Sequence, residues 1–272
     1  MDASEQRVFY YHADASPFGG HITHPVETIF PSHGSSSLAQ AGGHVSSSMG
    51  PFRLDSLASC EGAHSKIFGA KHKVSGSWTT MVTSVIEGLN VLEVVKADRV
   101  VSKVAVEHPH DGHHPKVTFV GSHFDNLRIA GVSIDPTLHY NMLATAKNKF
   151  PNVPCTEDKA FIDRAISQSQ TMIKAEGSPA WIRTRYGWVE SEKERRKKGY
   201  VVCSLVDQVE GARPGSSFGH IVHVPGFGNV FLGEVTVSHG QFRLTMIRIE
   251  MGCPAEGNLS IASAHSNGFT MP

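Results

Sequence analysis

Four ionisable residues stand inside segments that otherwise favour β-strands, and they are the first candidates for chemistry. His123 and Asp125 occupy alternate positions of the run VGSHFD, so a strand would direct both side chains to one face. Glu87 and Arg248 also lie within apolar runs. Because charged groups are rarely buried unless they are paired or used, we expect these four side chains to form the polar floor of a pocket in a β layer. The alternative is an ordinary solvent-facing side of a sheet.

A histidine beside a carboxylate is the arrangement that general-base catalysis needs. We expect His123 to accept a proton and Asp125 to orient its imidazole, while Arg248 or Tyr11 donates to a developing oxyanion. The sequence carries no phosphate-binding loop and no dinucleotide-binding fingerprint, so no cofactor is expected. Cyclisation, dehydration or isomerisation of a small, largely apolar organic molecule fits this set, because such reactions need shape and proton transfer.

Aromatic residues would supply the walls of the pocket. Five of them are the candidates for substrate contacts: Tyr11, Trp78, Phe161, Trp181 and Trp188. The last three belong to the segment 137–199, which we expect to cover the pocket as a lid.

Histidines also gather between residues 108 and 114, in the run HPHDGHH. The composition suits zinc or nickel, but a Gly/Pro turn between strands would be exposed, and a metal site needs ligands fixed by their neighbours. We therefore expect a solvated loop and no metal site. His220 and His223 are three apart on a predicted strand, where their side chains would point to opposite faces and could not chelate together.

The clearest strand pattern runs from residue 64 to residue 136. Six runs there favour strands: 66–73, 78–87, 89–95, 99–107, 116–124 and 127–134. In the fourth run, every second residue from 100 to 106 would share one face. We expect Gly88 and Asp98 to separate neighbouring strands, and the short connections favour antiparallel pairing.

The first fifty residues are less regular. Residues 7–30 predict a strand, a turn at Pro17 and Gly19-Gly20, and a second strand. Residues 31–50 are rich in glycine and serine, which indicates either a loop or small-residue strands packed where two backbones approach closely.

The segment 137–199 breaks the β pattern. Thr156 would cap a helix over residues 157–175. The apolar side chains of that helix would form one stripe: Phe161, Ile162, Ala165, Ile166, Met172 and Ile173. Gly177 and Pro179 would end it, and a strand would carry Trp181 and Trp188. The mixed-charge run 190–198 predicts a solvated hairpin tip. Strand patterns return between residues 200 and 262.

The chain as a whole is therefore expected to be mainly β, an antiparallel barrel or sandwich over residues 1–272 with one partly helical insertion. Lys plus Arg equals 25, as does Asp plus Glu, which argues against steering of nucleic acid or an anionic membrane. The first seven residues lack an apolar leader core, no run approaches roughly 18 apolar residues, and the four cysteines are too sparse for a disulfide scaffold. We expect a cytoplasmic protein with reduced thiols.

Parts of the sequence resemble the choice-of-anchor domains of bacterial surface proteins. The stretches PGFGNVFLGE at 225–234, FRLTMIRIE at 242–250 and LSIASAHS at 259–266 are similar to the end of those domains. The middle agrees loosely at Cys60, 84–99 and 120–131. The resemblance covers about half of the chain, implies an all-β fold and implies no activity. The excursion 137–199 departs from that pattern.

Three functions remain open on the sequence. The first is the cofactor-independent enzyme acting on a small hydrophobic molecule. The second is a binding module that holds such a molecule without turnover, and the third is a structural or surface module, which would self-associate as a homo-oligomer.

Overall fold

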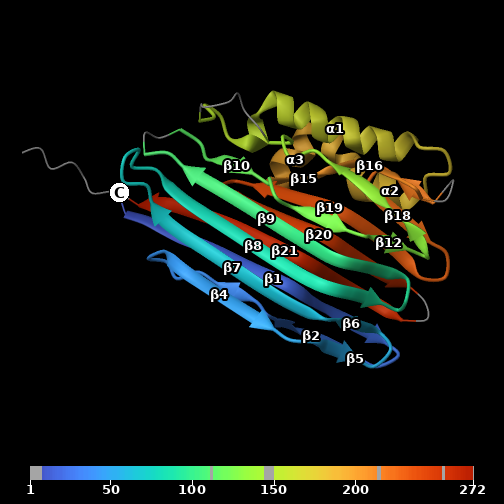
Figure 1. The fold of residues 1–272 in the computed structure, drawn as a ribbon. Helices are drawn as coiled ribbons and strands as arrows, with labels where there is room; N and C mark the ends of the chain where they lie inside the picture. Colours follow the sequence, from blue (N-terminus) through green and yellow to red (C-terminus); the bar gives the residue numbers. More distant parts are fainter. Residues whose placement is uncertain (1–7, 111–112, 144–149, 213–215, 253–254, 272) are drawn as a thin grey trace, which may run out of the picture.

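Two antiparallel sheets pack face to face in the computed structural model, which describes residues 8–110, 113–143, 150–212, 216–252 and 255–271 (Figure 1). The first sheet has the order β17 (Ser217–Phe218), β18 (Ile221–Val224), β19 (Gly228–Ser238), β20 (Gln241–Gly252), β21 (Glu256–Met271), β1 (Val8–His24) and β2 (Thr28–His33). In addition, β15 (Tyr200–Ser204) pairs with β19, and β3 (Ser36–Ser37) pairs with β1.

The second sheet has the order β13 (Val132–Ser133), β12 (Arg128–Ile129), β9 (Val95–His108), β8 (Trp78–Val91), β6 (Ala58–Cys60) and β5 (Phe52–Leu54). Beside that path, β10 (Lys116–Thr118) and β11 (His123–Asp125) pair with β9, and β7 (Gly62–Lys71) joins β8 to β4 (Gly43–Met49). A separate ribbon pairs β14 (Asp135–Leu138) with β16 (Val206–Glu210). The sheet orders of the described residues are open, so the fold is a sandwich and not a barrel.

One apolar core fills the space between the sheets and draws on chain segments from both sides of the insertion. Val104 of β9 and Leu244 of β20 are both fully buried in it. The hydroxyl of Ser102 donates across the interface to the carbonyl of Leu244 at 3.4 Å. The predicted alternation over residues 100–106 is confirmed, because every second side chain there is completely buried.

Several predicted strand ends are wrong because glycines interrupt long strands without ending them. Glu87 pairs with Arg99 and Leu89 pairs with Ala97, so Gly88 lies inside β8. The hairpin turn follows at residues 91–94, where the Val94 amide donates to the Val91 carbonyl at 2.9 Å. Its central residues, Leu92 and Glu93, have φ of 52° and 59°, the left-handed backbone that a type I′ turn requires at both positions.

The start of the chain shows the same error. The strand β1 runs unbroken through the expected turn at Pro17 and Gly19-Gly20. Gly20 is there because a Cβ would lie 2.3 Å from the carbonyl oxygen of Asn258 on the neighbouring strand. Between residues 31 and 50, the small-residue strands are confirmed for β3 and β4.

The insertion is more helical than the sequence predicts. It contains η1 (Cys155–Glu157), α1 (Lys159–Lys174), α2 (Ala180–Tyr186), η2 (Gly187–Glu190) and α3 (Glu192–Lys198), gathered beside β15, β16 and β18 in Figure 1. Asp158, not Thr156, caps α1 by accepting from the amide of Phe161 at 2.8 Å. The buried stripe of Phe161, Ile162, Ala165 and Met172 is confirmed.

The residues after α1 form helices where a strand and a hairpin were expected. The helix α1 ends at Lys174, before the expected Gly177 and Pro179, and Pro179 is the N-cap of α2. Trp181 therefore lies on α2 and Trp188 on η2. The charged run is the helix α3, capped by Ser191 and closed by Gly199 with φ of 71°. None of its residues is buried, so the expected solvation is confirmed.

Candidate functional site

The four predicted catalytic residues do not meet in one place. Glu87, His123 and Asp125 lie on the outer face of the second sheet, each with about half of its side chain exposed. The His123 Nε2 atom lies 3.5 Å from Asp125 Oδ2, so the predicted shared face is confirmed. Arg99 lies between Glu87 and Asp125. Its Nε atom is 3.8 Å from Glu87 Oε1, and it stands opposite Asp125 where β9 pairs with β11. These residues form an exposed charged stripe and not the floor of a pocket.

Arg248 corrects the prediction most clearly, because it belongs to β20 in the opposite sheet. The aromatic candidates also separate. Tyr11 and Trp78 are buried at one end of the core, where Trp78 stacks on Phe9 at 5.1 Å. Phe161 is buried where α1 meets the sandwich. The candidates therefore do not form the polar-floored pocket that was expected in one β layer, because the four polar residues lie in two sheets and Tyr11, Trp78 and Phe161 are buried in the core.

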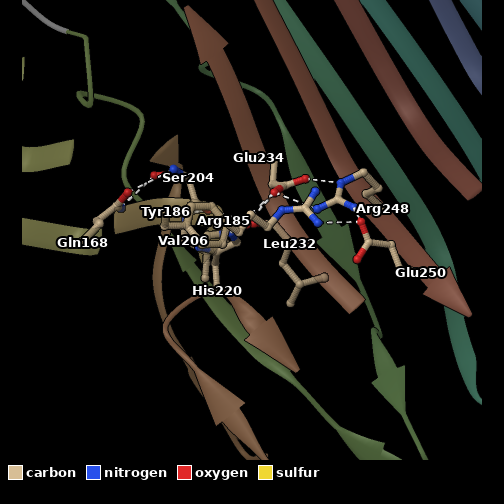
Figure 2. Close-up of polar contacts among 10 residues, drawn as sticks. All are labelled: Gln168, Arg185, Tyr186, Ser204, Val206, His220, Leu232, Glu234, Arg248 and Glu250. Atoms are coloured by element: carbon tan, nitrogen blue, oxygen red, sulfur yellow. Dashed lines mark hydrogen bonds and ion pairs between the residues drawn. The ribbon is translucent and has the colours of Figure 1, made fainter. Parts of the chain in front are cut away.

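Two of the candidates, Arg248 and Trp188, do come together, under the helical insertion. The centre of that region is Glu234 of β19, whose side chain is 11% exposed. The Tyr186 hydroxyl donates to Glu234 Oε1 at 2.9 Å and lies 3.4 Å from the Nε2 atom of His220 (Figure 2). Arg248 donates from Nε to Glu234 Oε2 and from Nη2 to Glu234 Oε1, the latter at 3.0 Å, so it grips both carboxylate oxygens.

A second carboxylate extends this cluster toward α2. Glu250 accepts a hydrogen bond from Arg248 Nη1 and another from Arg185 Nη1, the latter at 2.7 Å. The guanidinium carbon of Arg248 lies 3.6 Å from the centre of the Phe231 ring, and that of Arg185 lies 4.8 Å from the same ring. The cluster thus joins the insertion to the outer face of the sheet through charge pairs stacked on an aromatic ring. We call Tyr186, His220, Glu234, Arg248, Glu250 and Arg185 the Glu234 cluster.

A glycine in β19 explains why Glu234 faces the helices. Gly233 has φ of 61° and takes no part in the pairing with β20, which resumes between Glu234 and Thr245. The irregularity shifts the inward and outward alternation by one residue. Phe231 before it and Glu234 after it therefore both contact the insertion, although a regular strand would send them to opposite faces.

The helix α1 is fixed to the same strand through Gln168 and Ser204. Gln168 accepts from the Ser204 amide at 3.0 Å and donates to the Ser204 carbonyl at 2.9 Å, as Figure 2 shows. The Ser204 hydroxyl donates to the carbonyl of Leu232 at 2.7 Å and accepts from the amide of Val206 at 2.8 Å. These bonds hold β15, β19 and α1 in one rigid unit beside the Glu234 cluster.

The electrostatics of the cluster fix its protonation. Burial alone would raise the pKa of Glu234, but the contacts with His220 and Arg248 outweigh burial and hold that pKa well below its usual range. Burial, together with the charge of Glu234, raises the pKa of the Tyr186 phenol. Tyr186 therefore remains a proton donor and Glu234 remains ionised at neutral pH, so neither is suited to exchange protons with a substrate.

An open groove of about 460 Å³ lies between the Glu234 cluster and the second half of the insertion. Its lining residues come from the insertion and from the strands β15, β19, β20 and β21: Thr184, Arg185, Tyr186, Trp188, Lys198, Tyr200, Val202, Glu234, Thr236, Arg243, Thr245, Arg248 and Ser260. We call it the cationic groove, because four cations line it against one carboxylate, Glu234. Its volume lies in the range that small-molecule sites have, roughly 300–1,000 Å³.

Two of these cations form no salt bridge. Within the part of the chain that the structure describes, neither Lys198 nor Arg243 lies in salt-bridge contact with a carboxylate, although the more distant charge of Asp14 still acts on Arg243. The ammonium group of Lys198 lies 4.9 Å from the Trp188 ring and 5.9 Å from the Tyr200 ring. The two rings meet edge to face at 5.2 Å. The groove therefore offers positive charge beside an aromatic wall and the hydroxyl groups of three threonines and a serine.

Sequence reasoning missed most of the Glu234 cluster. Glu234 follows the apolar run VFLG, so the criterion that selected Glu87, a charge inside an apolar run, would have selected it too. His220 was set aside because it could not chelate together with His223, yet it is buried. Arg185 carries no signal in the sequence, because it reaches the cluster only through the packing of α2.

The histidine-rich run near residue 110 is only partly the solvated loop that was predicted. His108 is buried as the last residue of β9, whereas Asp111 lies outside the described residues. Within the described part of the chain, no group of three or more His, Cys, Asp or Glu side chains is placed to hold a metal ion. The described cysteines Cys60, Cys155 and Cys203 are free thiols.

Fold and site together define a class of protein: an antiparallel β-sandwich whose helical insertion is joined to one sheet by a buried ionic cluster beside a cationic groove. The chain belongs to the family described as a domain of unknown function, DUF8256, which matches residues 9–238. Glu234 lies inside the matched range, whereas Arg248 and Glu250 follow it on β20. Comparison with curated proteins found no match, and comparison with solved structures found none either. No helix among the described residues is long and apolar enough to span a membrane.

Proposed function

We propose that the protein is a binding module that holds a small hydroxylated organic acid, such as a sugar acid, in the cationic groove. The observation that carries this proposal is the excess of positive charge in the groove. Four cations and one carboxylate line it, and Lys198, which lies over the Trp188 and Tyr200 rings, forms no salt bridge within the described part of the chain. A ligand carboxylate would supply the missing charge through charge-assisted hydrogen bonds. Its ring would lie against Trp188 and Tyr200, and its hydroxyl groups would bond those of Thr236 and Thr245.

The Glu234 cluster supports this function as a scaffold. Arg248 and Arg185 are already engaged by Glu234 and Glu250, so they set the shape of the groove, while its positive potential comes from Lys198 and Arg243. A site built on strands and tied helices loses little conformational entropy when the ligand binds. This proposal takes up the binding module that the sequence left as an alternative, with a polar acid in place of an apolar molecule.

Calorimetric titration with D-glucuronate and with D-glucose tests the proposal, because the two sugars differ chiefly in the carboxylate that the cations of the groove would bind. We expect saturable binding of glucuronate and binding of glucose at least tenfold weaker. Arg243→Gln should weaken glucuronate binding roughly tenfold, the loss expected for one charge-assisted hydrogen bond. Arg99→Gln, on the outer face of the other sheet, is the matched control and should leave binding unchanged. Equal binding of both sugars would refute the proposal.

A second candidate function is cofactor-free proton transfer, and one arrangement favours it. His139 Nε2 lies 3.2 Å from Asp207 Oδ2, and Gln168 donates to the other oxygen of that carboxylate. This gives a base, an orienting carboxylate and a group that fixes the carboxylate, in a groove of about 480 Å³ that Arg164 also lines. The sequence assigned these roles to His123 and Asp125.

Hydrolysis of p-nitrophenyl acetate distinguishes the two histidines. If His139 acts as the base, the wild-type protein should hydrolyse the ester faster than free imidazole does. His139→Gln should reduce this excess rate at least tenfold, whereas His123→Gln should leave it unchanged. Equal rates for the wild type and both variants would remove this second function and leave the first untouched.

A further inference from the structure

A different cavity, of about 450 Å³, lies at the end of the sandwich where β1, β9, β20 and β21 meet. Phe9 and Phe242 form part of its wall, and both side chains are more than nine-tenths buried. Phe9 is fixed from behind by the stacked ring of Trp78, at 5.1 Å. Three prolines, one of them Pro109, add further rigid apolar surface. The cavity is therefore walled by rings that lose little freedom when a ligand binds.

His108 lines this cavity, and its hydrogen bonding is incomplete. The side chain is buried, with 8% of the residue exposed, and the Nε2 atom has no hydrogen-bond partner within the described part of the chain. Four hydroxyl groups share this condition: those of Ser35, Thr80, Ser84 and Ser266. None of the four lines the cavity, whereas His108 does. A buried polar atom without a partner costs free energy, so it marks a place where a ligand can supply a bond.

The charges around the cavity define what kind of ligand it fits. No Asp, Glu, Lys or Arg side chain is among its described lining residues. Burial lowers the pKa of His108 to about 4, so the imidazole is neutral at pH 7. A neutral imidazole has one nitrogen that donates and one that accepts, and a hydroxyl group can serve either. Three more exposed or half-buried histidines, His113, His114 and His239, lie at the rim. A cationic ligand would lose its hydration here and find no carboxylate, and the buried part of the wall around Phe9, Phe242 and His108 suits a neutral ligand.

We propose that this cavity binds a neutral phenolic compound, with its aromatic ring between Phe9 and Phe242 and its hydroxyl group bonded to His108. Aromatic side chains around an aromatic ligand favour edge-to-face and offset contacts. The phenolic hydroxyl completes the bonding of the one buried imidazole in the wall. This site is separate from the cationic groove in its lining residues and in the chemistry of its ligand, so it does not depend on the function proposed for that groove.

Binding of p-cresol and p-xylene to the intact chain tests the proposal, because the two molecules differ only by a hydroxyl and a methyl group. We expect p-cresol to bind the wild type roughly tenfold more tightly than p-xylene, which is the value of one hydrogen bond to a buried acceptor. His108→Phe should remove that difference while leaving p-xylene binding in place. Arg99→Gln, on the outer face of the second sheet, is the matched control and should change neither affinity.

Contacts between ligand and protein can also be measured on the wild type, so the test does not depend on whether the His108→Phe variant folds. Nuclear Overhauser effects from the ring protons of p-cresol should reach Phe9 and Phe242. Effects to other aromatic residues alone would overturn the proposal. Equal affinity of the wild type for p-cresol and p-xylene would overturn it as well.

Discussion

Replacement of Glu234 by glutamine is the sharpest perturbation of the ionic cluster, because it removes a charge and keeps the shape. Glu234 is 11% exposed and Arg248 is 16% exposed, so the pair is shielded from water. Breaking a buried pair by removing one partner costs about 3–5 kcal/mol, since the other charge stays buried. Glu250 still contacts Arg248, which places the expected cost at about 3 kcal/mol. With an m-value of about 3 kcal/mol/M, the urea midpoint should fall by about 1 M.

A double-mutant cycle and an exposed control complete this experiment. Glu234→Leu combined with Arg248→Met removes both charges, and the pair of changes should cost clearly less than the sum of the single changes. Glu87→Gln acts on the half-exposed pair with Arg99 and should cost less than about 1 kcal/mol. The reasoning would be refuted if Glu234→Gln cost no more than Glu87→Gln, or if the two single costs simply added.

The pH dependence of the free energy of unfolding, on its acid side, gives a second test of Glu234→Gln. The pKa of Glu234 is lower in the folded protein than in the unfolded chain, so its contribution is complete above about pH 4.5 and declines as the pH falls toward the folded-state pKa. Glu234→Gln should therefore flatten the loss of stability below pH 4.5. An unchanged acid slope would show that the carboxylate is not held ionised by its neighbours.

Three further changes follow from particular contacts. His108 has a folded-state pKa of about 4 against 6.5 when free, so the free energy of unfolding of the wild type should fall by about 3 kcal/mol as the pH falls from 6.5 to 4. His108→Phe should abolish most of that loss, as measured by urea unfolding across this pH range. Tyr186→Phe removes the hydrogen bond to Glu234 and should cost about 1.5–3 kcal/mol in the same assay. Gly233→Ala places a side chain at φ of 61° and 3.2 Å from Val206 Cγ2, which should cost about 1–3 kcal/mol, and full stability of this variant would contradict the account of the strand irregularity.

The β character of the fold could be predicted because alternation reports directly on burial. Residues 100–106 show this, since the predicted inner face is the buried one. The predicted strand lengths were wrong at Gly20 and Gly88, where glycine lies inside a strand and allows close packing or a local irregularity. In a single sequence such a glycine looks the same as a glycine in a turn. The turn at Leu92 and Glu93 gave no signal, since non-glycine residues adopt the left-handed backbone there.

The site was less predictable than the fold for a geometric reason. Arg248 and Trp188, both candidates from the sequence, line one groove, but their neighbours depend on which sheet each strand joins. The three residues grouped with Arg248 as catalytic lie in the other sheet, a pairing that alternation within single strands cannot reveal. Arg185 reaches Glu250 only because α2 packs over β20.

The proposed binding of an organic acid in the cationic groove is tested most directly by mapping where glucuronate binds. Titration of the isotopically labelled wild type, followed through its amide and indole resonances, should shift the Trp188 indole signal together with the amides of Thr236 and Arg243, along one saturable curve. Resonances of the outer face of the other sheet should stay in place. Shifts that fail to saturate, or that gather around Glu87 and His123 instead, would contradict the account.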